Sequence, residues 1–518
     1  MALVVAGRIA PLDGAAPDKI AKGRVYVDDD GTVERVVFAG AGEPAPAGYT
    51  GAGVTVIDVG EALVLPGLID LHNHIGFNAL PLWVEPRQKD PFAHHDSWTR
   101  AASYQGCISW PAKALVQAEP EALLAYVQLR ALVGGTTAIQ GWPAANREHL
   151  AVVRNVDSET AGGAGRNLIY TSALTKKPLE LAKMAQAQKK GAGFIYHCAE
   201  GQPGSLAARE FDDAARAGCL GPTFIGVHCT AVAAADWQRW KKTEAGALAW
   251  SPFSNLWLYG KTTDITAARK QGVRVCLGSD WGPSGTKNVL GELKVAKLVS
   301  DAEGLGLHDR ELVAMLTENP GDALARAWSK PIGRLVPGAF ADMTILRAPS
   351  GGGATAAWAA VVAATERDVA LVIVGGQARY GDEALMRAAG ARSSPLTVAG
   401  KKRSFAIPDP DKPAAAWSWK EITRRLEAVR KDPKSALERA DGKRRAYAGR
   451  MDAPEAPLEL VLDMPMGAQP LGANILDHAD EIAIPKLPTL VHDAAFLKAV
   501  RGRGFHGGLL DGLGRYYS

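Results

Sequence analysis

Hydrophobic and polar residues alternate along the first sixty or so positions of the chain, which is the pattern of short, half-buried strands. The segments VYVDD and TVERVVFA lie on either side of a DDDG turn, and this arrangement predicts a hairpin. The apolar runs VTVIDV and LVL follow. We therefore predict that residues 1–65 form one part of a β-domain.

From residue 66 to residue 335 the pattern changes. Apolar runs such as LIYTSAL, FIYH, FIGVH and VRVCLGS are separated by helical patterns such as EALLAYVQLRALV and LELAKMAQAQKK. Strands that alternate with helices predict a parallel sheet, and a closed (β/α)8 barrel is one such fold. The segment AVVRNVD, residues 151–157, fits either a degenerate strand or part of a helix. The pattern alone therefore does not supply a count of eight strands.

Strand-like segments return after residue 335, in ADMTIL and DVALVIVGG, with a Gly-rich loop at 351–353 between them. We predict that residues 336–400 complete the β-domain begun by residues 1–65, as a composite β-sandwich. Residues 401–518 form a C-terminal extension of mixed character. It contains a predicted capping box from Ser418 to Glu421. The helix that follows presents one apolar face, made of Trp419, Ile422, Leu426 and Val429.

Composition and charge exclude several classes of protein. A chain of 518 residues can bury a large core, so it needs no disulfide or structural metal to stay folded. The net charge of +4 is small, which argues against a nucleic-acid or membrane partner. The N-terminus lacks a signal-peptide pattern, and no apolar run is long enough to span a membrane. Five cysteines without regular spacing indicate reduced thiols, so we expect a cytoplasmic protein.

Candidate metal ligands follow four of the apolar segments in the central region. LVLPGLIDLHNH ends in His72 and His74, and residues two apart on a strand point the same way. FIYHCAE carries His197 and Glu200, FIGVHCT carries His228, and VRVCLGSDW carries Asp280. Parallel strands gather their carboxyl ends at one face of a barrel. Imidazole nitrogens and a carboxylate oxygen at that face suit zinc or a similar divalent ion.

The ordered elements LPGLIDLHNH, GGTT, HCAE, VHC, SNL and LGSD resemble the amidohydrolase superfamily, and PGAFADMTIL resembles that family's return into its β-domain. The resemblance covers roughly residues 1–385. The HxxE element, without an obvious bridging lysine, looks like the branch of guanine, cytosine and S-adenosylhomocysteine deaminases and triazine hydrolases. The resemblance implies the eight-stranded barrel that the pattern left open.

The resemblance also implies roles for the residues that match its motifs. His72, His74, His197 and Asp280 would bind one divalent ion, with zinc first and iron or manganese as alternatives. Asp280 would also accept a proton from a metal-activated water. His228 would hold the substrate or orient that water. Glu200, close behind His197 in the chain, would carry a proton to a ring or leaving nitrogen.

Other residues are predicted to contact the substrate, and two observations leave alternatives open. The predicted contacts are His94, His95, Trp83, Asn255 and Trp281. Trp281 and its Gly-Pro-Ser neighbours depart from the small residues and Asn that usually follow this element in the deaminases, so the substrate class stays open. Lys176 and Lys177 lie close to where other branches place a lysine that bridges two metals. Cys198 and Cys229 each follow a candidate histidine, and we expect packed thiols there.

Taken together, the residues predict a metal-dependent hydrolase that attacks a carbon–nitrogen bond in a small, cyclic molecule. Deamination of a heterocycle is the first choice, because Glu200 could protonate a ring nitrogen. Ring opening of a cyclic amide or imide, or hydrolysis of an exocyclic amide, is the alternative at the same site. A non-catalytic scaffold of the same superfamily is a second class, although such a protein would have lost the ligand set. We also expect the protein to form a homo-oligomer and to bind a small-molecule substrate.

Overall fold

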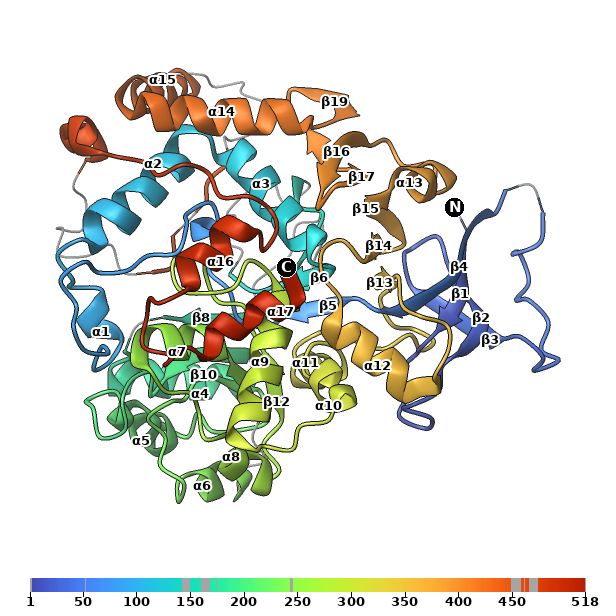
Figure 1. The fold of residues 1–518 in the computed structure, drawn as a ribbon, viewed down its shortest axis with the longest axis horizontal. Coiled ribbons are helices and arrows are strands. Elements are labelled where there is room, and N and C mark those ends of the chain that lie inside the picture. Colours follow the sequence, from blue (N-terminus) through green and yellow to red (C-terminus); the bar gives the residue numbers. More distant parts are fainter. Residues whose placement is uncertain are drawn as a thin grey trace.

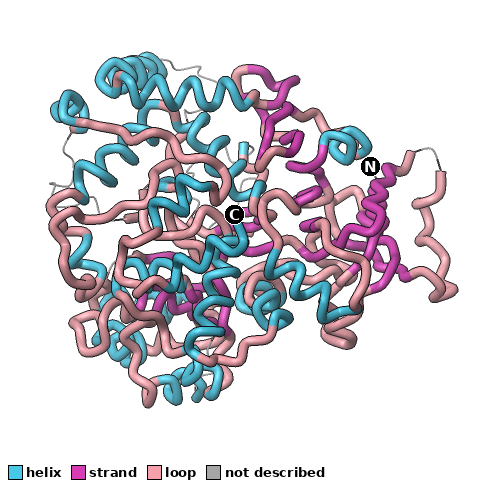
Figure 2. The backbone as a smooth tube through the Cα atoms, viewed as in Figure 1, coloured by secondary structure: helices cyan, strands magenta, loops and turns pink. Residues whose placement is uncertain are grey.

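The computed structural model describes residues 2–51, 53–141, 150–159, 168–173, 175–242, 246–448, 458–460, 462–464 and 474–517. Figure 1 shows a helix-covered body that carries a β-sheet on one flank. The strands form two groups, one inside the body and one in the flanking sheet (Figure 2). Among the described residues, no helix is both long and apolar enough to cross a bilayer.

The flanking sheet is built from two parts of the chain, one before the barrel region and one after it. Its nine strands are ordered β16-β17-β15-β14-β13-β4-β1-β2-β3 in a single hydrogen-bonded sheet. They are β1 (Leu3–Ile9), β2 (Ala21–Val27), β3 (Val33–Phe38), β4 (Thr55–Pro66), β13 (Met343–Leu346), β14 (Val369–Val374), β15 (Gln377–Asp382), β16 (Ser394–Val398) and β17 (Lys401–Phe405). β4 pairs antiparallel with β13, which joins the segments before and after the barrel. The composite β-domain and its β2–β3 hairpin are therefore confirmed.

Among the described residues, eight parallel strands form the barrel. They are β5 (Leu68–Asp70), β6 (Thr136–Ile139), β7 (Arg154–Asn155), β8 (Ile169–Ser172), β9 (Gly193–Cys198), β10 (Phe224–His228), β11 (Ala247–Trp250) and β12 (Val275–Leu277). β5 to β7 and β8 to β12 form two ladders. The Leu168 amide donates to the Asp157 carbonyl (2.8 Å) at one seam, and the Asp280 amide donates to the His72 carbonyl (3.0 Å) at the other. The ring of strands is thereby joined, and AVVRNVD supplies a short strand.

Helices follow most of the barrel strands and cover the outside of the ring. The predicted helical segments EALLAYVQLRALV and LELAKMAQAQKK form α3 (Pro120–Val133) and α4 (Pro178–Gln188). The other barrel helices are η1 (Ile75–Phe77), α1 (His95–Trp98), η2 (Gln105–Ser109), α2 (Trp110–Ala118), α5 (Ala208–Ala217), α6 (Trp237–Lys242), α7 (Pro252–Tyr259), α8 (Ile265–Lys270), α9 (Val289–Glu303), α10 (Asp309–Ala314) and α11 (Glu318–Leu324). α12 (Gly353–Ala363) packs on α10 and α9, and α13 (Glu383–Ala388) packs on the flanking sheet.

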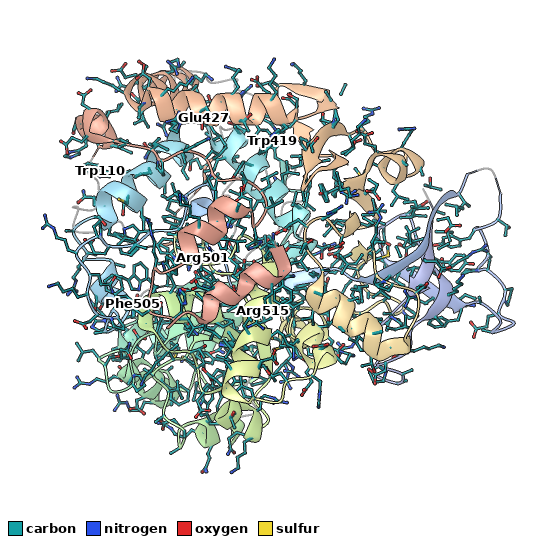
Figure 3. The ribbon with its side chains drawn as sticks, in the orientation of Figure 1. Trp110, Trp419, Glu427, Arg501, Phe505 and Arg515 are labelled. Atoms are coloured by element: carbon teal, nitrogen blue, oxygen red, sulfur yellow. The ribbon has the colours of Figure 1, made fainter. Side chains whose placement is uncertain are left out.

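The C-terminal extension lies against the outside of the barrel. Its elements are β18 (Pro408–Asp409), β19 (Lys412–Ala416), α14 (Trp419–Lys431), α15 (Pro433–Ala448), η4 (Ile475–Glu481), α16 (Ala494–Val500), η5 (Leu509–Leu513) and α17 (Gly514–Tyr517). α14 packs on α3, and α15 packs on α2. Trp419, labelled at the start of α14 in Figure 3, stacks on Tyr126 of α3 with ring centroids 6.0 Å apart.

The start of α14 follows the predicted local signal. The Ser418 hydroxyl accepts a hydrogen bond from the Glu421 amide at 3.1 Å, which satisfies one of the free donors of the first turn. Ile422, Leu426 and Val429 are buried on the face that meets the barrel. Capping and apolar periodicity therefore specify this helix, and its docking on α3 buries the face that they predict.

Candidate metal centre

The candidate ligands lie where strands of the barrel end. His72 and His74 follow β5, His197 lies in β9, His228 is the last residue of β10, and Asp280 follows β12. The backbone turns sharply there, since His228 and Asp280 have φ of 60° and 59°. Such left-handed conformations cost non-glycine residues about 1–3 kcal/mol and are typical of functional sites. The turns aim these side chains into the mouth of the barrel instead of along the strands.

Close approach of β5 and the end of β12 brings two of the ligands together. Gly278 permits this approach, because a Cβ at that position would lie 2.5 Å from the Cβ of His72. The His72 Nε2 atom consequently lies 3.3 Å from Asp280 Oδ1. Any larger residue at position 278 would push the two strand ends apart and separate the pair.

The histidine and aspartate side chains converge on one small volume. His74 Nε2 is 3.1 Å from His197 Nε2, and it is 3.7 Å from Asp280 Oδ1. His228 Nε2 is 3.9 Å from Asp280 Oδ2. Ligand atoms of His72, His197 and His228 lie within 4.8 Å of one another, as do those of His72, His74 and Asp280. The structure therefore brings together all the predicted ligands and His228 in a buried cluster.

The outer nitrogen of each imidazole faces a hydrogen-bond acceptor. The four pairs are His72 Nδ1 with Gln140 Oε1 (3.3 Å), His197 Nδ1 with the Ser172 carbonyl (3.0 Å), His228 Nδ1 with Asn255 Oδ1 (2.8 Å) and His74 Nδ1 with Asp463 Oδ2 (2.8 Å). An N–H at Nδ1 donates to each acceptor, so a neutral ring keeps its lone pair on Nε2. Outer partners that fix the tautomer in this way are typical of metal-bound histidines.

The inner nitrogens face one another, an arrangement that suits a shared cation. The Nε2 atoms of His74 and His197 face each other at 3.1 Å, with a lone pair on each when both rings are neutral. His72 Nε2 is buried without a hydrogen-bond partner among the described residues. An unsatisfied buried acceptor costs about 1–3 kcal/mol. A divalent ion would satisfy these lone pairs and the Asp280 carboxylate together, so the donor set fits the predicted metal.

Electrostatics keep most of the cluster in its ligating form. Burial lowers the pKa of His197 well below its usual value, and the positive charges of neighbouring histidines lower it further. Burial also lowers the pKa of His72. Burial alone would raise the pKa of Asp280, but its close contact with His72 and the nearby histidines hold it below its usual range. At neutral pH two imidazoles are therefore neutral and the carboxylate is ionised, as metal binding requires.

Glu200 lies beside the cluster at the end of a hydrogen-bonded chain. Its Oε1 atom is 3.8 Å from His228 Nε2. The Tyr259 hydroxyl donates to the same oxygen at 2.6 Å, and the Trp98 indole N–H donates to the Tyr259 oxygen at 2.8 Å. Burial raises the pKa of Tyr259 well above its usual value, and the negative charge of Glu200 adds to this effect. Tyr259 thus remains a donor that holds the carboxylate in place.

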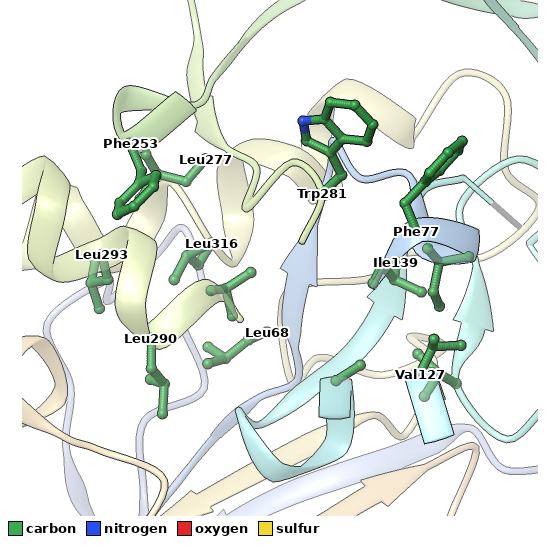
Figure 4. Packing of buried hydrophobic residues seen from close by; sticks show 14 of the residues in the cluster. Leu68, Phe77, Val127, Ile139, Phe253, Leu277, Trp281, Leu290, Leu293 and Leu316 are labelled. Atoms are coloured by element: carbon green, nitrogen blue, oxygen red, sulfur yellow. The ribbon is translucent and has the colours of Figure 1, made fainter. Parts of the chain in front are cut away.

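Aromatic rings form one wall beside the histidines. Trp281 meets His74 edge to face, with ring centroids 6.2 Å apart, and it meets Phe77 in the same manner at 5.2 Å. Figure 4 shows the Trp281 and Phe77 rings close together above the packed side chains of the barrel. The Trp281 N–H donates to the Ser284 hydroxyl at 2.5 Å, which holds the ring upright. Of the predicted substrate contacts, Trp281 lies against the ring face of the cluster, beside His74.

The other predicted substrate contacts occupy different positions. Asn255 lies behind His228, and its amide group donates to Thr262 and Thr263. His95 is buried and pairs with Glu210 at 2.9 Å. Burial alone would lower the pKa of His95, but the Glu210 carboxylate raises it to about 9. These contacts favour supporting roles for Asn255 and His95.

Trp83 and His94 lie in the loop that follows the first barrel strand. Trp83 is buried, donates its N–H to Ser103 at 2.9 Å and stacks on Phe92. The backbone of His94 forms a bridge with Gly201, next to Glu200. Both residues therefore shape the loop, and the Nδ1 atom of His94 is buried without a hydrogen-bond partner among the described residues.

Several predictions about lysines and thiols concern the surroundings of the cluster. Lys176 pairs with Glu180 at 3.6 Å, and Lys177, whose side chain is exposed, donates its backbone amide to Glu180 at 2.9 Å. Both lysines thus lie outside the buried cluster, where neither can bridge two metals in this arrangement. Cys198 and Cys229 are buried free thiols, as predicted.

Three residues around the histidine cluster were not predicted from the sequence. Gln140 is the first residue beyond the TTAI strand, a position equivalent to that of the ligands on other strands, so a signal was present. Asp70 shares a strand face with His72 and accepts from the Ser279 amide (2.9 Å); burial raises its pKa to about 7. Asp463 lies 389 residues beyond His74 in the chain, and no pattern in the sequence connects the two.

Comparison with known proteins finds related hydrolases. Residues 172–379 match the model of the amidohydrolase family. A 5-methylthioadenosine/S-adenosylhomocysteine deaminase of Halobacterium salinarum is 27% identical over 363 residues, which make up 63% of this chain and 80% of the relative. Other 5-methylthioadenosine/S-adenosylhomocysteine deaminases are similarly distant. E. coli guanine deaminase is 29% identical over 129 residues, 25% of this chain and 29% of that protein.

Solved structures share the fold at low sequence identity. The structure of E. coli guanine deaminase is 17% identical, has a TM-score of 0.56, and the match covers 74% of this chain and 100% of that one. An adenosine deaminase from Xanthomonas campestris with bound zinc is 15% identical, with a TM-score of 0.57 and coverage of 85% and 98%. These likenesses establish the barrel with its β-sheet domain as the fold of the chain.

Proposed function

We propose, from the match of residues 172–379 to the amidohydrolase family, that this chain hydrolyses a carbon–nitrogen bond of a small cyclic molecule with the help of one divalent ion. One observation carries the proposal: four imidazoles whose outer nitrogens are all engaged gather their inner nitrogens in one buried volume, and three of those nitrogens lie within 3.9 Å of an Asp280 oxygen. His72, His74, His197 and Asp280 would hold the ion. When bound, it supplies a Lewis acid that makes a water molecule nucleophilic near neutral pH.

The residues of the chain divide the remaining work among themselves. Asp280 is held ionised, so its second oxygen, Oδ2, can accept a proton. His228 donates through Nδ1 to Asn255, which leaves Nε2 as an acceptor that can orient the attacking water. Glu200 is held through one oxygen by Tyr259, so it can carry a proton to a ring or leaving nitrogen. A leaving amine must be protonated because an amide anion is a very poor leaving group.

Deamination of a nitrogen heterocycle is the form of the reaction that we favour. The aromatic wall made by Trp281 and Phe77 next to His74 suits a flat ring. The similarity to 5-methylthioadenosine/S-adenosylhomocysteine deaminase and to guanine deaminase supports the same class. Ring opening of a cyclic amide or imide would use the same groups, and it differs in releasing no ammonia.

The test is a screen of the metal-loaded protein against purines, pyrimidines, triazines and cyclic amides. Ammonia release and ring opening are measured in parallel, together with metal content by elemental analysis. Ammonia release by protein with about one equivalent of metal supports the proposal. Turnover without ammonia would replace deamination with ring opening. Protein that binds no divalent metal and turns over none of these compounds would favour a scaffold and refute the proposal.

A further inference from the structure

The histidine cluster receives one of its contacts from the far end of the chain. Asp463, in the C-terminal extension, places Oδ2 2.8 Å from Nδ1 of His74. The two residues are separated by 389 positions. The Asp463 side chain is 25% exposed, whereas the His74 side chain is 1% exposed. The carboxylate thus covers the outer edge of a buried imidazole and retains some contact with solvent.

The residues on either side of Asp463 are embedded in the same region. Leu462 packs against η1, the turn directly after His74, because a Cβ added at Gly76 would lie 2.9 Å from Leu462 Cδ2. Met464 is buried in the main hydrophobic core. Burial, and secondarily the charge of Asp463, raises the pKa of Asp157 at the end of β7 to about 8. Asp463 therefore lies over the strand ends that form the barrel mouth.

The extension that carries Asp463 is attached to the barrel elsewhere by buried polar contacts. The Lys287 amide donates to Nε2 of His492 at 2.9 Å, and Nδ1 of His492 pairs with Glu366 at 2.6 Å. The Tyr126 hydroxyl of α3 donates to the Pro488 carbonyl at 2.5 Å. These contacts hold residues 488–492 of the extension against the barrel.

His74 differs from the other three histidines in the charge of its outer partner. Gln140, the Ser172 carbonyl and Asn255 are neutral acceptors contributed by the barrel. A carboxylate is a stronger acceptor, and it makes the ring a better electron donor to a metal than a neutral partner does. Loss of an outer partner of this kind typically weakens metal binding by about 10- to 100-fold.

We propose that Asp463 is a positioning residue that orients His74 for metal binding, so that the C-terminal extension completes the metal centre. The proposal rests on the metal-dependent function proposed above. It gives the extension a role in the active site in addition to packing. It also implies that metal affinity depends on the docking of a segment that lies outside the barrel.

The test compares Asp463→Ala and Asp463→Asn with a matched control, Asp480→Ala. Asp480 lies in the same extension and forms an exposed ion pair with Lys434 at 2.8 Å, away from the histidines. Metal affinity is measured by competition with a chelator. Visible absorption of the cobalt(II)-loaded protein reports the ligand geometry. The melting temperature of the metal-free proteins reports folding.

We expect Asp463→Ala to weaken metal binding by about 10- to 100-fold and to change the cobalt spectrum. Asp463→Asn keeps an acceptor oxygen and should restore part of the affinity, while Asp480→Ala should match the unmodified protein. Equal affinity and identical spectra for Asp463→Ala and Asp480→Ala would overturn the inference. If the unmodified protein itself binds no metal, the proposed function fails first, so the two failures are distinguishable.

Discussion

The barrel mouth and the C-terminal extension reach the same histidine cluster by different routes. The mouth contributes its groups through strand ends, where neighbouring residues in the sequence set the direction of each side chain. The extension contributes Asp463 by docking on α2 and α3 and crossing to His74. A strand end holds its ligand through short-range geometry, whereas the extension holds its residue only while a large surface remains packed. Removing a side chain from the barrel mouth should therefore change metal binding and turnover by a different amount than removing one from the extension.

The largest effect on metal binding is expected from the loss of a predicted ligand at the barrel mouth. His72→Ala removes a nitrogen that lies 3.3 Å from Asp280, so metal affinity should fall by more than the ~100-fold expected from losing an outer partner. Turnover should be lost with the metal. Elemental analysis and the ammonia assay check both. His478→Ala, at a partly exposed histidine in the extension, is the control, and full metal and activity in His72→Ala would remove this residue from the site.

Glu200→Gln separates proton transfer from metal binding. The amide oxygen of Gln can still accept from Tyr259, but the side chain can no longer carry a proton. We expect kcat to fall about 10²- to 10⁴-fold, with unchanged metal content. Single-turnover kinetics and elemental analysis measure the two quantities. Loss of metal in this variant would instead identify Glu200 as part of the ligand set.

Tyr259→Phe removes the donor that holds Glu200 and should have a smaller effect. A hydrogen bond to a charged group contributes about 1.5–3 kcal/mol, which corresponds to a roughly 10- to 100-fold loss of kcat if it is fully used in the reaction. The control is Tyr170→Phe, because Tyr170 is 44% exposed. Equal kcat in the two variants would show that Tyr259 does not position Glu200 during turnover.

The smallest effect concerns how firmly the extension is held. Burial would raise the pKa of Glu366, but His492 and Asn288 lower it from 4.5 to about 2. A depressed carboxyl pKa stabilises the fold above pH 4.5, and this contribution is lost as the pH falls from about 4.5 toward 2. Glu366→Gln should therefore lower the free energy of unfolding by ~1–3 kcal/mol at neutral pH. This loss should become smaller as the pH falls.

Thermal melting of the two proteins between pH 7 and pH 3 measures this difference. Glu427→Gln serves as the control, because Glu427 pairs with Arg430 on the outer surface of α14 (Figure 3). A difference between Glu366→Gln and the unmodified protein that grows on acidification would contradict the assignment of a depressed pKa to Glu366.

Local patterns predicted much of the fold and most of the cluster. The spacing of His72 and His74 places both rings on one face, and apolar runs that end in His228 and Asp280 mark two more strand ends. Ser418 and Glu421 predicted the start of α14. The short strand at Arg154–Asn155 was ambiguous because two residues carry too little periodicity to distinguish a strand from a helix. Only its pairing with β6 settles it.

By itself, the sequence determined the features that depend on nearest neighbours: strand and helix periods, the cap of α14, and the order in which the ligands follow their strands. The tertiary structure alone decided which acceptor meets each outer nitrogen, that Asn255 and His95 face protein groups, and that Asp463 reaches His74. The reason is physical. A hydrogen bond between residues 389 positions apart depends on how whole surfaces dock, and no local pattern encodes that docking.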